Sequence, residues 1–311
     1  MLYIPNNSIR PAFNQAFEQA VFEMCADDDI LLLWRNTPCV VCGRNQNIFA
    51  EVDAARAARD GVEIIRRDTG GGTVFHDLGN INYAIMTDAK GIAVDYDSML
   101  DIVVQALNEL GIKAHKNRTC DIAIGDRKIS GSAQRQTKTR VLHHGTMLYN
   151  TDLTALERYS KGVQGVDSKA IGSDRTHVTN ISDHVRFRSA DQFMEKLAER
   201  LIKGGRISEA SSDVIKRAEE LCNEKYLNWE WTFGKNPPFH CVRERDDIRI
   251  EYSAKHGIIT DFIADSRYVT SDGSEFVGAR LDCDTIHDIC TRTVKDGHAE
   301  IFYKMIFGEA E

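Results

Sequence analysis

The chain has 311 residues, of which 42% are hydrophobic, enough to bury the core of one large domain plus a small one. Its formal net charge is −8, and the basic stripe of a general nucleic-acid binder is missing. No apolar run approaches the ~18 residues needed to span a bilayer, and residues 1–6 look like neither a signal peptide nor a transit helix. We therefore expect a cytoplasmic protein that binds neither nucleic acid nor membranes.

Helix and strand periodicities alternate through the first half of the chain. The apolar residues Phe13, Phe17, Val21 and Met24 share one helical face, which predicts an amphipathic helix. The predicted elements up to residue 111 are that helix, two strands within 30–42 separated by a turn at 36–38, a helix over 53–59, strands over 62–67 and 81–86, and a helix from about 98 to 110 capped by Asp97 or Ser98.

The second half of the chain predicts a large domain followed by a small one. Its predicted elements are helices over 189–203 and 211–226, a linker over 228–239, a hairpin of 248–252 with 258–263, and helical stretches near 275–281 and 284–293. The order does not alternate as βαβ, which argues against a Rossmann sheet. We expect a mixed α+β fold with a catalytic domain over 1–228 and an accessory domain over 229–311.

Three consecutive glycines follow two arginines in residues 66–80. Glycine lets a ligand approach the backbone closely, and successive exposed N–H groups can hold an anion. The side chains of Arg66 and Arg67 could add charge-assisted contacts to a phosphate or carboxylate. An ordinary glycine turn with solvated arginines explains this segment equally well when it is taken alone.

A second segment, residues 121–133, predicts a hairpin that turns at Gly125. Strand alternation would put Lys128 and Ser130 on one face and Ile129 on the other. A lone lysine on a strand is more often a surface residue. Small residues at 131–133 nevertheless leave room for a ligand, and His143-His144-Gly145-Thr146 follows before a further strand at 147–149.

Eight cysteines are scattered along the sequence, which is typical of a reducing compartment. Cys39 and Cys42 have CxxC spacing inside an apolar run. No second such pair or paired histidines accompany them, so buried packing is favoured over a metal or redox site.

Together these segments resemble the lipoate–protein ligase family, a relative of the biotin–protein ligases. The matching text is Arg66-Arg67-x-x-Gly70-Gly71-Gly72-x-Val74-Phe75-His76-Asp77-x-Gly79-Asn80, the stretch 125–133 and the stretch 143–146. Residues 33–36, 43–47 and 175–181 also fit, the last as an adenylate-covering loop. The resemblance implies a largely antiparallel mixed sheet with helices, a class II synthetase-like core, and a small C-terminal α+β domain.

The resemblance implies an enzyme that activates lipoate with ATP and Mg²⁺. Lipoyl-AMP would form first, and the lipoyl group would then pass to a lysine of a 2-oxoacid dehydrogenase E2 lipoyl domain or of a glycine-cleavage H protein. Forming such an anhydride needs fixed positive charge and backbone donors more than it needs a covalent nucleophile.

The same resemblance makes Lys128 the central catalytic residue, bridging the lipoate carboxylate and the α-phosphate. Asp121 would orient Lys128 or hold Mg²⁺. The other residues implied at the ATP or lipoyl-AMP site are Arg67, Gly70, Gly71, Gly72, Thr73, Val74, Phe75, Ser130, Ala133, Arg135 and Thr179. Those implied at the lipoate site are Trp34, Gly71, His76, His144 and Gly145. Each histidine could equally be a hydrogen-bonded core residue.

Three positions depart from the family pattern: Thr69, Cys120 and His177.

The sequence leaves one alternative function open and argues against another. A lipoyl- or octanoyl-transferase on the same fold could keep the lysine and accept a preformed activated acyl donor, although Cys120 lacks the usual cysteine motif of thioester-forming relatives. A regulator like the biotin repressor needs a DNA-binding module, and the first helix begins too early to leave room for one.

Overall fold

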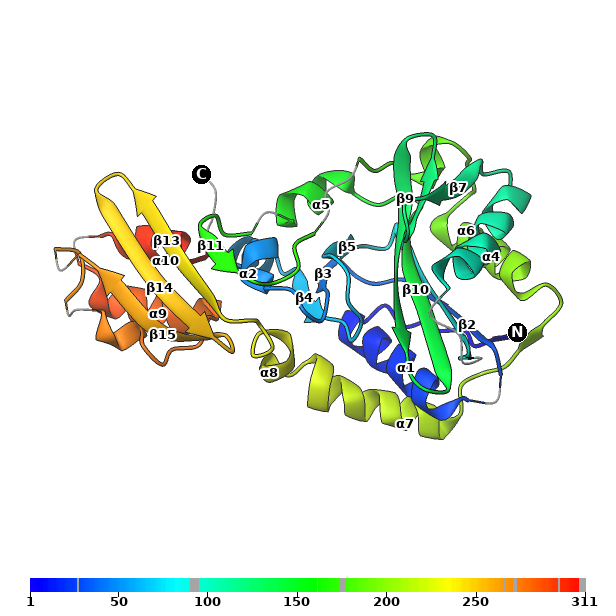
Figure 1. The fold of residues 1–311 in the computed structure, drawn as a ribbon, viewed down its shortest axis with the longest axis horizontal. Helices are drawn as coiled ribbons and strands as arrows, with labels where there is room; N and C mark the ends of the chain where they lie inside the picture. Colours follow the sequence, from blue (N-terminus) through cyan, green and yellow to red (C-terminus); the bar gives the residue numbers. More distant parts are fainter. Residues whose placement is uncertain are drawn as a thin grey trace.

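The computed structural model describes residues 1–26, 28–89, 95–160, 162–173, 177–265, 267–270, 273–295 and 297–307. Within these residues, eight strands form a mixed sheet at the centre of the larger part of the molecule (Figure 1). In spatial order they are β12 (Arg206–Ile207), β1 (Leu2–Tyr3), β2 (Ile30–Trp34), β6 (Asn80–Asp88), β10 (Arg140–Leu148), β9 (Arg127–Gln136), β8 (Asp121–Ile124) and β7 (Ala114–Asn117). β1 pairs in parallel with its two neighbours, and the other pairs are antiparallel. The predicted α+β class with a largely antiparallel sheet is confirmed.

Helices cover both faces of this sheet because its central strands are apolar on both sides. In β2, Leu32 faces a layer formed by α1 (Pro11–Met24) and α7 (Ser212–Leu221), which continues into a π-helical turn (Cys222–Tyr226). The neighbouring Leu31 faces the opposite layer, formed by α4 (Tyr96–Glu109) and α6 (Ala190–Ile202). A 3-10 turn (Ile181–Asp183) packs on that second layer through Ile181.

The helix predicted from about residue 98 begins earlier than expected. The carboxylate of Asp95 accepts a hydrogen bond from the Ser98 amide at 3.2 Å and is the N-cap, so neither Asp97 nor Ser98 has that role. The sequence offers three polar residues within four positions that could each begin the helix, and only the backbone conformation distinguishes them.

A smaller sheet lies beside the large one and carries the glycine segment. It consists of β4 (Glu63–Arg66), β3 (Cys39–Cys42) and β5 (Val74–His76), and the short helices α2 (Ile48–Glu51), α3 (Ala54–Arg59) and α5 (Leu153–Tyr159) pack near it. The two strands predicted within 30–42 therefore belong to different sheets. β5 was not predicted, because three residues are too few to show a periodicity.

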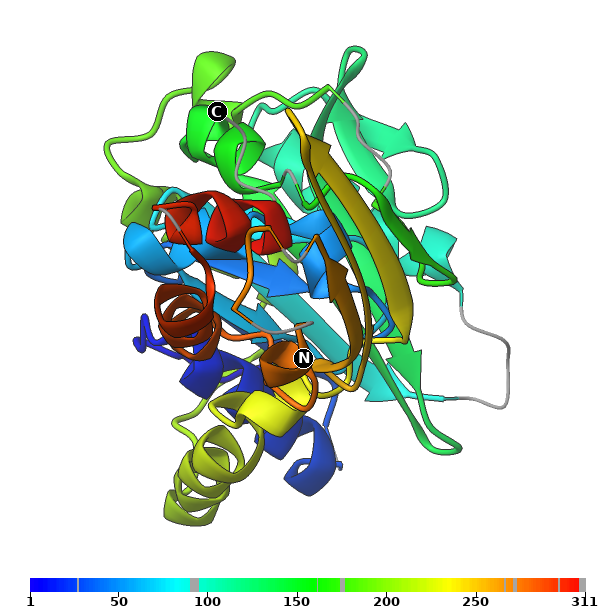
Figure 2. The same ribbon diagram turned by 90° about the vertical axis from the view of Figure 1, so that its left-hand side faces the viewer.

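The C-terminal part contains a four-stranded sheet, β11 (Val166–Ser168), β13 (Phe239–Arg245), β14 (Ile248–Lys255) and β15 (Ile258–Ala264). Figures 1 and 2 show α9 (Cys283–Thr293) and α10 (Ala299–Phe307) against this sheet, at the opposite end of the molecule from α4 and α6. The hairpin of β14 and β15 agrees with the sequence. The hydrophobic cluster of this part also takes in Phe49 and Val163, so it is continuous with residues of the larger part.

Three sequence expectations for the C-terminal part are corrected. The linker over 228–239 begins with a helical turn, α8 (Trp229–Thr232), because Asn228 caps it. The stretch near 275–281 contains only a 3-10 turn (Ser274–Phe276). The last element of the described residues is α10, which was not predicted because apolar residues cover most of it and hide the periodicity.

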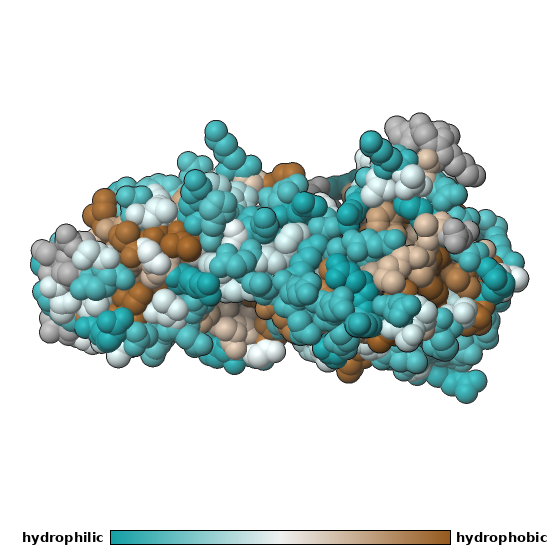
Figure 3. All heavy atoms as spheres, turned by 90° about the horizontal axis from the view of Figure 1, so that it is seen from below, coloured by the Kyte–Doolittle hydropathy of each residue, from teal (hydrophilic) through white to brown (hydrophobic). Residues whose placement is uncertain are grey.

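One face of the molecule is polar over its middle (Figure 3). Figure 3 shows one face on which hydrophilic side chains dominate the middle and hydrophobic ones gather toward the two ends. No helix in the described part of the chain is both long enough and apolar enough to cross a bilayer. None of the eight cysteines forms a disulfide.

Candidate functional site

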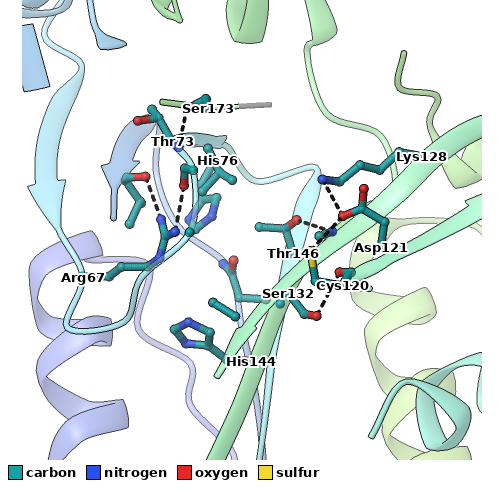
Figure 4. Close-up of a pocket in the computed structure, with 18 of the residues that line it drawn as sticks. Arg67, Thr73, His76, Cys120, Asp121, Lys128, Ser132, His144, Thr146 and Ser173 are labelled. Carbon is teal, nitrogen blue, oxygen red and sulfur yellow. Dashed lines mark hydrogen bonds and ion pairs between the residues drawn. The ribbon is translucent and has the colours of Figure 1, made fainter. Parts of the chain in front are cut away.

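A cavity of about 210 Å³ lies between the two sheets. Figure 4 shows Lys128 and Asp121 on one side of it, with Arg67 and Thr73 on the other. Its wall is formed by Gln15, Trp34, Val41, Arg67, Gly71, Gly72, Thr73, Val74, His76, Asn82, Arg118, Cys120, Asp121, Lys128, Gly131, Ser132, Ala133, His144, Gly145, Thr146 and Ser173. The glycine segment and the Lys128 hairpin, more than 40 residues apart in sequence, thus meet around one space.

A row of residues in register crosses five strands of the large sheet along this cavity. Trp34 is opposite Asn82, and Asn82 is opposite Thr146. The Gly131 amide donates to Thr146 Oγ1 at 3.4 Å, and Gly131 is opposite Asp121. With neighbouring strands about 4.8 Å apart, the row spans about 19 Å. It gives the cavity one end near Asp121 and another near Trp34.

Lys128 lies at the Asp121 end, in an orientation that strand alternation does not predict. The pairing of β8 with β9 shifts at Ile129, which has no residue opposite it and forms a β-bulge. The prediction that Lys128 and Ser130 share a face is therefore wrong. Ser130 is buried beneath the cavity wall, whereas the Lys128 side chain extends over Gly131.

The Lys128 ammonium pairs with one carboxylate and lies over a residue that has no side chain. Its Nζ lies 2.8 Å from Oδ1 of the buried Asp121. A Cβ added to Gly131 would come within 2.7 Å of this Nζ, so a side chain there would displace the amine. The backbone is also fixed, because Lys128 N–H donates to the His177 carbonyl and its carbonyl accepts from Thr179 N–H.

The glycine segment is folded around the Arg67 guanidinium. Nη2 donates to the carbonyls of Gly70 (2.6 Å) and Gly72 (2.7 Å), and Nη1 donates to the Val41 carbonyl (3.1 Å). Gly71 has a φ of +87°, a conformation that glycine adopts at little cost. Burial lowers the pKa of Arg67 to about 10, so the group stays charged at neutral pH. Arg67 therefore shapes this loop with most of its donors.

Close backbone contacts hold the loop on its other side. A Cβ on Gly43 would lie 2.1 Å from the Gly71 carbonyl oxygen, so these two backbones touch directly. Ser173 Oγ accepts from the Thr73 amide (2.9 Å) and from Gln46 Nε2 (3.0 Å). Ser173 thereby closes the loop from a distant segment.

Arg66 is fully buried and connects this region to the C-terminal part. Its guanidinium donates to three backbone carbonyls in residues 43–46, to the Thr232 carbonyl (2.9 Å) and to Asn236 Oδ1 (2.6 Å). Trp231 Nε1 donates to the Arg66 carbonyl at 2.7 Å. Of the two predicted phosphate-binding arginines, Arg66 therefore has a structural role.

His144 connects helix α1 to the glycine loop. Its Nδ1 lies 2.8 Å from Oε1 of the buried Glu18, and its Nε2 lies 2.8 Å from Thr69 Oγ1. Thr69 Oγ1 also accepts from Arg67 Nε at 3.1 Å. His144 thus lines the cavity and is at the same time a hydrogen-bonded core residue. The sequence had offered a site residue and a core residue as alternatives.

A chain of amides fixes the protonation of His76. Asn14 Nδ2 donates to Asn36 Oδ1 at 2.7 Å, so Asn36 presents its Nδ2 to His76 Nδ1 at 2.9 Å. Nδ1 is therefore the acceptor, and the single proton of the neutral ring lies on Nε2. Burial, aided by the nearby Arg67 charge, lowers the pKa of His76 to about 3.

We expect the protein to lose stability as the pH falls below about 6.5. Burial lowers the pKa of both His76 and His143 to about 3, from the usual 6.5, so the unfolded chain binds protons that the folded chain does not. Each histidine should contribute a loss of up to about 2 kcal/mol between pH 6.5 and 5. Urea unfolding across this range tests the prediction. His143→Gln should flatten the pH profile, and the exposed His115→Gln should not.

The structure brings together most of the predicted site residues, but some lie outside the cavity wall. Those outside are Gly70, Phe75, Ser130, Arg135 and Thr179. The Phe75 ring packs on Tyr159 with centroids 5.7 Å apart. Arg135 pairs with Asp68, a carboxylate that also pairs with Lys225. The Phe75 and Arg135 side chains are therefore occupied by packing and by ion pairs around the site.

Five residues of the cavity wall lie in none of the segments that the sequence indicated as parts of a site: Gln15, Val41, Asn82, Arg118 and Ser173. Asn82 gave a usable signal, because it is a polar residue inside an otherwise apolar strand. The others have no local signal and reach the cavity only through tertiary packing. Arg175 and Thr176 of the predicted covering loop lie outside the described residues.

The cysteines and carboxylates do not form a metal centre in the described ranges. No group of three or more His, Cys, Asp or Glu side chains there could hold a metal ion. Cys39 and Cys42 are buried in β3, and burial raises the pKa of Cys42 to about 11. These thiols are packing residues. Cys120 lines the cavity, and burial together with Asp121 raises its pKa.

The sequence model of the lipoyl protein ligase A/B catalytic domain matches residues 10–202. The chain belongs to this family. A bipartite lipoate protein ligase from Thermoplasma acidophilum, studied with its E2 lipoyl domain, is 26% identical to this ligase. The match covers 74% of this chain and 94% of the Thermoplasma chain, with a TM-score of 0.65. A lipoate-protein ligase A bound with ATP is 27% identical, with 74% and 97% coverage and a TM-score of 0.62.

Nearly the full length of this sequence also has a structural counterpart. LipL1 of P. falciparum, solved in complex with lipoate, covers 99% of both chains with a TM-score of 0.64 at 22% identity, which supports the fold alone. The family predicted from the sequence is confirmed. So is the predicted enzyme class, a lipoate–protein ligase.

Proposed function

We propose that this ligase joins lipoate to a lysine side chain of an acceptor lipoyl domain in two steps, using ATP in the first. The observation that carries the proposal is the Lys128 ammonium, fixed by Asp121 at one end of a cavity whose opposite wall is the glycine loop. A cation beside a loop of backbone donors suits the joining of a carboxylate to a phosphate. The similar ligases support this assignment, since one was solved with ATP and another was studied with an E2 lipoyl domain.

In the first step a lipoate carboxylate oxygen attacks the α-phosphorus of ATP, and the bond to pyrophosphate breaks. Both reactants are anions, so repulsion and developing charge oppose the reaction. Lys128 supplies a compact charge between them and stabilises the charged oxygens of the transition state. Asp121 is a positioning residue, because it fixes the direction in which the ammonium points.

The glycine loop is assigned to the nucleotide. Gly71, Gly72, Thr73 and Val74 line the cavity, and the two glycines have no side chain to keep phosphates or the nucleoside away from the backbone. Arg67 holds this loop in shape and adds positive charge behind it. Phe75, Arg135 and Thr179 act indirectly, through the packing of the segments on which the lining residues lie.

A magnesium ion fits this site only as a companion of the nucleotide. Mg²⁺ is commonly bound by one or two carboxylates together with substrate phosphates, and Asp121 is a carboxylate in the wall. Asp121 already pairs with Lys128, so it could hold the ion only in part. The ion would neutralise phosphate charge.

In the second step the amine of the acceptor lysine attacks the carbonyl carbon of lipoyl-AMP. The bond from that carbon to the phosphate oxygen breaks, AMP leaves, and the amine loses a proton. Lys128 would hold the carbonyl oxygen as it gains charge. The acceptor is proposed to be an E2 lipoyl domain or a glycine-cleavage H protein, in the cytoplasm, where thiols remain reduced.

We assign residues 1–228 to the catalytic domain and 229–311 to an accessory domain. The family model ends at residue 202, and the ATP-bound relative covers only 74% of this chain, which supports a separable addition. Arg66 and its bonds to Thr232 and Asn236 connect the accessory domain to the loops of the site. The accessory domain is therefore expected to influence the glycine loop.

The experiment is a paired assay of the full chain with lipoate and a purified lipoyl domain. We expect pyrophosphate release and a lipoyl mass shift of the lipoyl domain, both of which require ATP. A transferase would modify the lipoyl domain from supplied lipoyl-AMP but release no pyrophosphate from ATP. Modification without either donor would contradict both functions.

Cys120→Ser should retain a sizeable fraction of the ligation rate. The raised pKa of the Cys120 thiol disfavours the thiolate that a thioester mechanism needs. The measurement is the rate of lipoyl-domain modification, together with mass spectrometry of the intact enzyme. Complete loss of activity in the variant, with an acyl group trapped on wild-type Cys120, would instead support a transferase.

Gly131→Ala should lower the rate of adenylation about tenfold or more without unfolding the protein. The new Cβ would meet Nζ and Cε of Lys128, at 2.7 and 2.8 Å, and this flexible side chain would move away from Asp121. Small displacements of a catalytic group carry large rate penalties. Pyrophosphate release and the melting temperature should be measured together. An unchanged rate would show that the position of the ammonium does not matter.

A further inference from the structure

Three side chains in the wall of the cavity each keep one buried N–H group without a hydrogen-bond partner. Trp34, His76 and Asn82 line the cavity and are each at least 97% buried. Trp34 Nε1, His76 Nε2 and Asn82 Nδ2 make no hydrogen bond. Buried donors without partners are rare in proteins and are costly, so their retention together calls for an explanation.

All three groups are hydrogen-bond donors. The indole N–H of Trp34 can only donate, and the amide chain that ends at His76 Nδ1 leaves the ring proton on Nε2. Asn82 Oδ1 accepts from Asn80 Nδ2 at 3.0 Å, and the Asn82 Nδ2 group has no acceptor. The cavity wall thus carries three N–H groups that lack an acceptor.

The register of the large sheet places two of these groups, those of Trp34 and Asn82, where the tail of an acyl chain would lie. Asn82 is two strands away from Gly131, over which the Lys128 amine extends, and Trp34 is three strands away. These separations correspond to about 10 and 14 Å. A medium-length acyl chain whose carboxylate lies at Lys128 reaches these two groups with its last carbons.

We propose that Asn82, with Trp34 and His76, selects acyl substrates whose tail carries a hydrogen-bond acceptor and disfavours a plain alkyl tail. This inference rests on the proposed function. Sulfur is a weak but polarisable acceptor, so the two sulfur atoms of lipoate relieve the unpaired donors in part. The saturated tail of octanoate leaves all three unpaired. Sites with polar groups placed for a substrate reject analogues that lack the matching atom.

The test measures the affinity of the full-length protein for lipoate, octanoate and 8-hydroxyoctanoate by calorimetry. We expect the wild type to bind lipoate and 8-hydroxyoctanoate at least about tenfold more tightly than octanoate. Asn82→Leu should weaken both and strengthen octanoate, so that the ratios approach one. Trp34→Phe, which keeps a ring but removes the N–H, should reduce the ratios part of the way. Asn223→Leu makes the same exchange as Asn82→Leu on an exposed helical turn and should leave the ratios unchanged.

Equal affinity of the wild type for octanoate and lipoate would overturn the inference, and so would unchanged ratios in a folded Asn82→Leu protein. Ligation of both acids at equal rates would contradict the inference while leaving the proposed function intact. Failure of the wild type to bind or ligate any of the three acids would contradict both.

Discussion

Lys128→Ala should lower the rate of lipoyl-AMP formation by about 10²–10³-fold or more while leaving the protein folded. The side chain is a quarter exposed and pairs with one carboxylate, so its removal opens no large hole in the core. What is lost is the positive charge between two anionic reactants. Lys128→Arg should not restore the rate, because the broad guanidinium does not fit over Gly131 as the compact amine does. Lipoate-dependent pyrophosphate release measures the effect.

Lys116→Ala is a matched control for this experiment. Lys116 lies on β7 of the same sheet and also pairs with carboxylates, those of Asp97 and Asp101, away from the cavity. Its removal should leave adenylation unchanged. Near wild-type adenylation by a folded Lys128→Ala protein would remove Lys128 from the mechanism.

Gly71→Val should abolish measurable binding of ATP and strongly weaken binding of lipoate. At a φ of +87° a β-branched residue is strained by about 1–3 kcal/mol. In addition, the new Cβ would lie 2.9 Å from Arg67 Nη2, the group around which the loop is folded. The loop would have to open, and its backbone would no longer line the cavity. Calorimetry with each ligand measures the loss.

The same substitution at a second glycine separates the effect of backbone strain from the effect of losing the binding site. Gly111 has a φ of +80°, and nothing lies within 4 Å of a Cβ built there. Gly111→Val should therefore lower the melting temperature by a similar strain yet keep ligand binding. If Gly71→Val bound ATP as the wild type does, the glycine segment would be only a turn.

Much of the fold could be predicted because local signals agreed with one another. The helix at Pro11–Met24 shows clear periodicity, and Gly125 gives the turn of the β8–β9 hairpin. The bulge at Ile129 could not be predicted, since it arises from pairing with β8 and not from residue type. It nevertheless decides that Lys128, and not Ser130, reaches the cavity.

The site was harder to predict where one side chain joins distant segments. Arg66 and Arg67 are adjacent and look alike in sequence, yet Arg66 bonds to Asn236 and Arg67 to the loop that follows it. His144 depends on Glu18, 126 residues away. Such partners are chosen by packing, so the sequence could indicate that these residues matter but not what each one does.

The most direct test of the central claim is to mix the wild-type protein with ATP and lipoate, without any acceptor, and to look for protein-bound lipoyl-AMP by mass spectrometry. The account predicts that lipoyl-AMP and pyrophosphate form together, that Lys128→Ala forms little of either, and that added lipoyl domain consumes the adenylate as AMP appears. Lipoylation of the added domain with no lipoyl-AMP detected at any time, or an adenylate that forms as well in Lys128→Ala, would contradict it.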